Sequence, residues 1–173
     1  LQVNLLRSHA AGVGSPLPDE IVRGAIAIRL NSLALGHSGV RPVVCERLVG
    51  LLDSGWVPVV PGTGSLGASG DLAPSAHAFL PLLGEGRVRD PDGKEVSGAE
   101  MVEALGWEPL SLEAKEGLAL INGTHFMASV ASQVLEKTRK LFDLCDLAAA
   151  ATVDALHGAE AAFDPRAHAL RPH

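Results

Sequence analysis

The chain has 173 residues, which is enough for one domain with a hydrophobic core. Hydrophobic residues make up 47% and charged residues 20%, which excludes a disordered segment, and no apolar run reaches the ~20 residues of a membrane span. The net charge is −6 without a basic cluster, so we expect neither a nucleic-acid nor a membrane partner.

The spacing of apolar residues predicts helices along most of the chain, separated by glycines and prolines. The expected helical ranges are 1–10, 19–35, 42–52, 71–83, 97–105, 113–121 and about 124–157. The prolines of residues 56–61 favour an extended segment, and the turn sequence of residues 90–93 predicts a small β-hairpin near 87–96. We therefore expect an all-α fold, an elongated helical bundle with one long central helix.

The last of these helices is the longest, because no residue breaks its pattern before Gly158. Small side chains at 148–151 and at Ala155 permit close approach of another helix. We expect this helix to pack against equally long neighbours, in an elongated bundle or across subunits.

Residues 62–77, GTGSLGASGDLAPSAH, form the segment that most strongly indicates chemistry. Its glycines allow turns that are closed to other residues, and the acid and proline that follow are typical of a helix start. In such a turn the amide nitrogen of Gly70 can attack the carbonyl carbon of Ala68. Loss of water, including the hydroxyl of Ser69, leaves a ring with an exocyclic methylidene, an electrophile that no ordinary side chain supplies.

Residues 64–77, GSLGASGDLAPSAH, resemble the cofactor motif of the histidine and aromatic amino-acid ammonia-lyases. The resemblance implies that Ala68, Ser69 and Gly70 are catalytic and cyclise by themselves to methylidene-imidazolone. It also implies an ammonia-lyase/fumarase-like fold, a small-molecule amino-acid substrate, and no metal or nucleotide cofactor.

Two further segments resemble the family at its substrate site. Ser8-His9-Ala10-Ala11-Gly12 is similar to the histidine-specific members, in which the histidine contacts the substrate imidazole, so His9 is expected to bind substrate. The asparagine that matches Asn122 lies beside the methylidene ring, which implies a catalytic and substrate-binding role. His125 departs from the glutamine usual in histidine-specific members, and either alters the choice of substrate or fills a similar volume.

Asp71 and His77 follow the motif directly. Asp71 either caps its own helix or helps to orient the precursor loop during cyclisation. His77 lies on an apolar helix and is expected to be a core histidine with satisfied hydrogen bonds.

The remaining histidines and both cysteines show no metal-ligand spacing, so we expect no metal site. The residues concerned are His37, Cys45, Cys145, His157, His168 and His173. The cysteines are typical of reduced thiols in a cytoplasmic protein.

The resemblance covers essentially the whole chain and implies a histidine ammonia-lyase, which converts L-histidine to urocanate. A phenylalanine or tyrosine ammonia-lyase or aminomutase, and a non-catalytic oligomerising helical fragment, are the alternatives. The family forms homotetramers and takes its general base from a tyrosine, and this chain has no tyrosine. Since the chain begins with Leu1, we expect residues 1–173 to be a single incomplete domain of a longer protein that is inactive alone.

Overall fold

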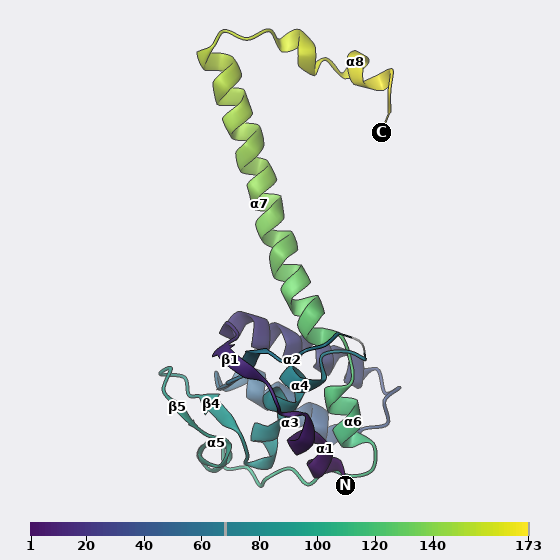
Figure 1. The fold of residues 1–173 in the computed structure, drawn as a ribbon, viewed down its shortest axis with the longest axis vertical. Helices are drawn as coiled ribbons and strands as arrows, with labels where there is room; N and C mark the ends of the chain where they lie inside the picture. The colour runs from purple at the N-terminus through teal and green to yellow at the C-terminus, as the bar shows by residue number, and fades with distance from the viewer. Residues whose placement is uncertain (68, 173) are drawn as a thin grey trace. The chain divides into compact units, whose positions relative to one another are not determined.

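The computed structural model describes residues 1–67 and 69–172 (Figure 1). They divide into two compact units, Leu1–Ser132 and a second one that begins at Gln133. Among the described residues, no helix is both long and apolar enough to cross a membrane.

The first unit is mostly helical, as the sequence predicts. Its helices are α1 (Gln2–His9), α2 (Asp19–Ala34), α3 (Pro42–Asp53), α4 (Leu72–Phe79), the 3₁₀ helix η1 (Leu80–Leu83), α5 (Gly98–Ala104), α6 (Glu116–Ile121) and the first turns of α7 (His125–Ala155). Local sequence accounts for several of their ends. Pro42 lies in the first turn of α3, and Ser97 and Glu100 form the expected capping box of α5.

Within the described residues, five short strands accompany the helices. β4 (Arg87–Arg89) and β5 (Glu95–Ser97) form the predicted hairpin, with Val88 opposite Val96, and β2 (Val57–Pro58) pairs with the other edge of β4. β1 (Val13–Pro16) pairs antiparallel with β3 (Pro61–Thr63), an element that the sequence did not predict. Both strands are short and contain proline and glycine, so no alternating pattern indicates them.

The core of the first unit lies around α4, which packs against α1, α6, β2 and β3. Phe79 of α4 and Leu6 of α1 are fully buried in it, together with Leu120 of α6. The helix that follows the glycine-rich segment is therefore enclosed by the rest of the unit, which fixes the start of α4 in space.

An ion pair with a buried carboxylate joins the start of α3 to α6. The Glu116 carboxylate is 1% exposed and accepts hydrogen bonds from Nε of Arg41 at 2.8 Å and from its Nη2 at 2.7 Å. The backbone N–H of Glu113 donates to the same carboxylate at 2.8 Å. These bonds hold the pKa of Glu116 at about 2.

The second unit contains the remainder of α7, the 3₁₀ helix η2 (Glu160–Phe163) and α8 (Pro165–Ala169). The unbroken α7 confirms the long helix expected near 124–157. From Gln133 to Pro172 none of the described residues is buried, and large apolar side chains such as Phe142 and Leu147 are each 66% exposed.

Candidate active site

A cavity of about 310 Å³ in the first unit brings together residues that are far apart in the sequence. It is lined by Ser8, His9, Ala11, Gly64, Leu66, Ser69, Gly70, Leu72 and Ala73. One wall is the end of α1 and the residues that follow it, and the other is the glycine-rich loop with the first turn of α4. Of the predicted site residues, His9, Ser69 and Gly70 thus share a single cavity.

His9 is held by its own helix. Its Nδ1 lies 2.8 Å from the carbonyl oxygen of Leu5, and the Ser8 hydroxyl donates to the same oxygen at 2.9 Å. Because a carbonyl oxygen can only accept, we assign the proton of the neutral imidazole to Nδ1. Nε2 of His9 is then a hydrogen-bond acceptor, suited to a ligand that carries an N–H or O–H group.

Ser69 and Gly70 both line the cavity, and Gly70 is also pressed against the backbone of Gly123. The φ angle of Gly70 is +105°, and a Cβ built there would lie 2.5 Å from the carbonyl oxygen of Gly123. The position therefore requires glycine for its conformation and for the close approach. Ala68, the third residue of the predicted cofactor, lies outside the described residues.

The Asp71 carboxylate, which is 1% exposed, connects the loop to the start of α7. One oxygen accepts from the Ser65 hydroxyl at 2.9 Å and the other from the backbone N–H of Met127 at 2.9 Å. The carboxylate makes no capping bond to α4, so the expectation that Asp71 caps its own helix is wrong. Its bond to Ser65 agrees with the alternative, a role in orienting the precursor loop.

Asn122 ends α6 and is exposed. Its backbone N–H donates to the carbonyl oxygen of Leu118 at 2.9 Å. The next residue, Gly123, contacts Gly70 of the glycine-rich loop. Asn122 therefore directly precedes, in the sequence, a residue that contacts this loop. Its side chain is not part of the cavity lining, and its catalytic and substrate-binding roles stay predictions.

His125 is 3% exposed and is not part of the cavity lining. Its Nε2 lies 2.8 Å from the hydroxyl of Ser75, which itself donates to the backbone oxygen of Asp71. Nε2 of His125 therefore carries the proton, and Nδ1 has no hydrogen-bond partner among the described residues. Burial and the nearby charge of Arg29 lower the pKa of His125 to about 4, against an opposing effect of Asp71. Contact of His125 with substrate stays a prediction.

His77 accepts a hydrogen bond from the backbone N–H of Gly12 at 3.0 Å through Nε2. The ring is half-buried, and burial lowers its pKa. The bond at Nε2 agrees with the expectation of satisfied hydrogen bonds, but the half-buried ring is not the core residue that the sequence predicts. The sequence did not indicate its partner, which lies 65 residues away.

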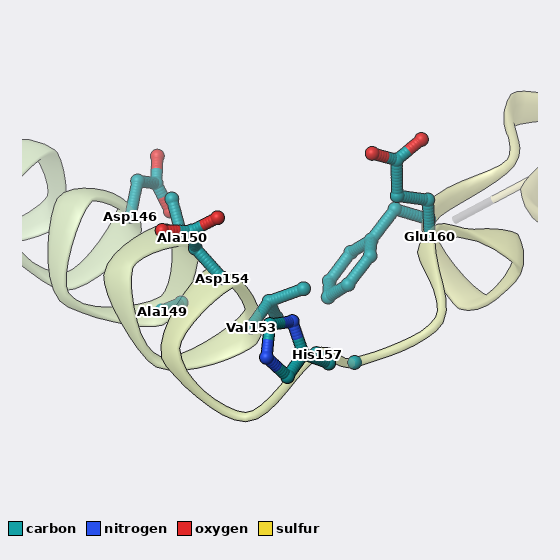
Figure 2. Close-up of a pocket in the computed structure, with 9 residues that line it drawn as sticks. Asp146, Ala149, Ala150, Val153, Asp154, His157 and Glu160 are labelled. Atoms are coloured by element: carbon teal, nitrogen blue, oxygen red, sulfur yellow. The ribbon is translucent and has the colours of Figure 1, made fainter.

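Larger cavities elsewhere among the described residues contain none of the predicted site residues. One of about 970 Å³ lies between α2 and α3 and is mainly apolar. Another, of about 680 Å³, lies in the second unit, where Asp146 and Asp154 of α7 face a space that Glu160 also borders (Figure 2). A third, of about 550 Å³, is lined by residues of η2 and the start of α8. Within residues 1–67 and 69–172, no group of three or more His, Cys, Asp and Glu side chains is arranged to hold a metal ion.

Sequence reasoning missed Ser65, Gly12 and Gly123 as supports of the site. The glycine at 123 beside the predicted Asn122 is the available signal, because close backbone approach often requires glycine. No sequence pattern indicates the hydrogen bond of Ser65, because its partner Asp71 could equally have capped its own helix.

Comparison with known proteins places the whole chain in one family. The sequence model of the aromatic amino acid lyases matches residues 1–173. Over its full length the chain is 51% identical to the histidine ammonia-lyase of Symbiobacterium thermophilum and 49% identical to that of Alkaliphilus metalliredigens, and it covers 34% of each. The chain thus spans about a third of the length of these relatives.

Solved structures show the same likeness. The histidine ammonia-lyase from Trypanosoma cruzi superimposes on the full chain with a TM-score of 0.94 and 40% identity, over 34% of its own length. The phenylalanine aminomutase of Pantoea agglomerans does so with a TM-score of 0.94 and 36% identity, over 33% of its length. The family match covers residues 1–173 and these solved structures share the mostly helical fold, so the chain belongs to the aromatic amino acid lyase family.

Proposed function

We propose that the full-length protein is a histidine ammonia-lyase, which eliminates ammonia from L-histidine to give urocanate. The observation that carries the proposal is the cavity shared by His9 and the pair Ser69 and Gly70. The identity of 49–51% to histidine ammonia-lyases supports the choice of substrate.

We propose that Ala68, Ser69 and Gly70 form the methylidene-imidazolone group and that no metal or nucleotide is required. The described residues fit this group, because Gly70 has no Cβ to obstruct ring closure and Ser69 lies at the cavity wall. The group, once formed, supplies an electrophilic carbon to a nucleophile of the substrate. The Asp71 carboxylate accepts a hydrogen bond from Ser65 of the loop, and its backbone N–H donates to the carbonyl oxygen of Gly123 at 2.8 Å.

His9 would recognise the substrate side chain. Its Nε2 accepts, and the imidazole of L-histidine can present an N–H donor in one of its tautomers. Phenylalanine has no such donor and would leave the acceptor of His9 unpaired, which discriminates against it. Asn122 would supply a neutral amide beside the substrate, which can bind a developing charge without exchanging protons.

Tyrosine is the second candidate substrate, for an ammonia-lyase or an aminomutase. The favouring observation is the same acceptor at His9, because a phenolic O–H can also donate to it. Comparing turnover of histidine, tyrosine and phenylalanine by the full-length protein distinguishes the substrates. Cinnamate as the main product, or no urocanate at all, would overturn the proposal.

We further propose a cytoplasmic homo-oligomer, a tetramer, in which residues 1–173 form part of one domain. The exposed apolar side chains of α7 after Gln133 support this, because exposed apolar patches mark interaction surfaces.

Were the chain a non-catalytic oligomerising fragment, the protein would keep its unmodified mass. Ring formation instead removes the mass of two water molecules, and S69A provides the control that cannot acquire the methylidene.

A further inference from the structure

His77 joins the two walls of the candidate active site. It lies on α4, whose first turn supplies Leu72 and Ala73 to one wall. Its Nε2 accepts from the backbone N–H of Gly12 at 3.0 Å, and Gly12 directly follows the opposite wall residue Ala11. The hydrogen bond therefore ties the segment that carries His9 to the helix that follows Ser69.

The packing around this bond leaves little free space. A Cβ at Gly12 would lie 3.2 Å from both Nε2 and Cδ2 of His77, and 3.3 Å from Cβ of Pro61. A Cβ at Gly64 would lie 2.9 Å from Cα of Gly12 and 3.3 Å from Cβ of Ala73. Gly12 and Gly64 thus allow the two walls to approach closely. The hydrogen bond from Gly12 to His77 fixes the position of one wall relative to the other.

The protonation of the ring follows from the bond. A backbone N–H can only donate, so Nε2 of His77 is unprotonated and Nδ1 carries the proton of the neutral ring. Burial lowers the pKa of His77, which favours this neutral form. The ring itself is not part of the cavity lining.

We propose that His77 is a positioning residue for substrate recognition: by holding Gly12, it fixes the spacing between His9 and the wall formed by Ser69 and Gly70. The inference rests on the proposed function, because it assumes that a substrate spans these two walls. A substrate side chain that donates to His9 while its amino-acid end lies at Ser69 needs one particular spacing. If the segment around Gly12 moved, the bond to His9 would weaken before the chemistry at Ser69 was affected.

The test compares H77Q and H77N in the full-length protein. The end of a glutamine side chain reaches the place of Nε2 and can accept from Gly12, whereas that of asparagine reaches only the place of Nδ1. We expect H77Q to keep the KM for L-histidine within about twofold, and H77N to raise it about five- to tenfold with a smaller change in kcat, the effect of one lost hydrogen bond to bound substrate. Intact mass and a melting curve for each variant verify ring formation and folding.

A second comparison excludes a merely structural effect. In an H9L background the substrate contact is already absent, so H77N should raise KM by less than about twofold. The inference is overturned if H77N forms the ring and leaves KM unchanged, if H77Q is no better than H77N, or if H77N has its full effect on KM in the H9L background. Failure of the proposed function would appear separately, as wild-type protein that does not turn over histidine.

Discussion

The backbone N–H of Asp71 donates to the carbonyl oxygen of Gly123 at 2.8 Å, and this contact places the start of α7 against the glycine-rich loop. The two residues are 52 positions apart, and the segment between them contributes Phe79, Met101 and Leu120 to the core. Gly70, which precedes Asp71, is held against Gly123 by the same contact.

Replacing Gly70 by alanine should abolish ring formation. The new Cβ would lie 2.5 Å from the carbonyl oxygen of Gly123 and would occupy a φ of +105°, so the loop must move. Intact mass should then be that of the unmodified chain. G39A is the matched control, because Gly39 also has a positive φ, +67°, but no atom within 4 Å of the built Cβ. A normal ring in G70A would contradict the proposed role of this close approach.

Removing the Ser65 hydroxyl should loosen the precursor loop without unfolding the protein. S65A eliminates the bond to the Asp71 carboxylate, which keeps its bond to Met127. We expect a loss of about 1 kcal/mol in the free energy of unfolding and slower ring formation, followed by mass against time after synthesis. S132A, which removes only hydroxyl bonds to the backbone of its own helix, is the control. Equal rates in the two variants would show that Ser65 does not orient the loop.

Replacing His9 by leucine should reduce selectivity for substrates whose side-chain ring carries a hydrogen-bond donor. Leucine cannot accept a hydrogen bond, so the substrate imidazole loses its partner in the cavity. We expect kcat/KM for L-histidine to fall about tenfold or more, and that for L-phenylalanine to fall less. Steady-state rates with both amino acids measure the ratio. An unchanged ratio would exclude His9 from substrate recognition.

Protonation of His125 should destabilise the fold in mild acid. Its pKa is about 4 in the folded protein, against 6.5 as the ordinary value. The unfolded chain therefore binds more protons between these values, and stability falls as the pH drops from 6.5 towards 4. H125Q can still donate to Ser75 and has no ionisable group, so its loss over this range should be smaller by about 2 kcal/mol. Urea unfolding at several pH values gives both curves. The slope that remains in H125Q includes His77, whose pKa is also lowered.

The ion pair of Arg41 and Glu116 should cause a separate loss of stability, at a lower pH than the loss caused by His125. The folded pKa of Glu116 is about 2 against an ordinary 4.5, so its contribution is complete above 4.5 and is lost as the pH falls towards 2. E116Q should cost about 2 kcal/mol at neutral pH. E113Q is the matched control, because Glu113 binds the same arginine but is 65% exposed, and it should cost less than about 0.5 kcal/mol. Equal costs would mean that burial of Glu116 adds nothing.

Local sequence determined most of the helices of this protein. Apolar spacing, the proline of Pro42 and the capping box of Ser97 act within a few residues, and the structure agrees with each of them. The resemblance around residues 64–77 likewise indicated the family that the comparisons then showed. Pairing of β1 with β3 was not predictable, because Val13 and Thr63 meet only after the intervening core has formed.

The sequence by itself determined where the chain is helical and which family it resembles, because both are written in short, contiguous patterns. Only the tertiary structure decided what those residues contact: Asp71 bonds Ser65 and α7 in place of its own helix, and His125 is buried beside Ser75. When several hydrogen-bond partners are within reach of a side chain, the packing of distant segments decides which one it binds. That choice depends on backbone positions that no local pattern encodes.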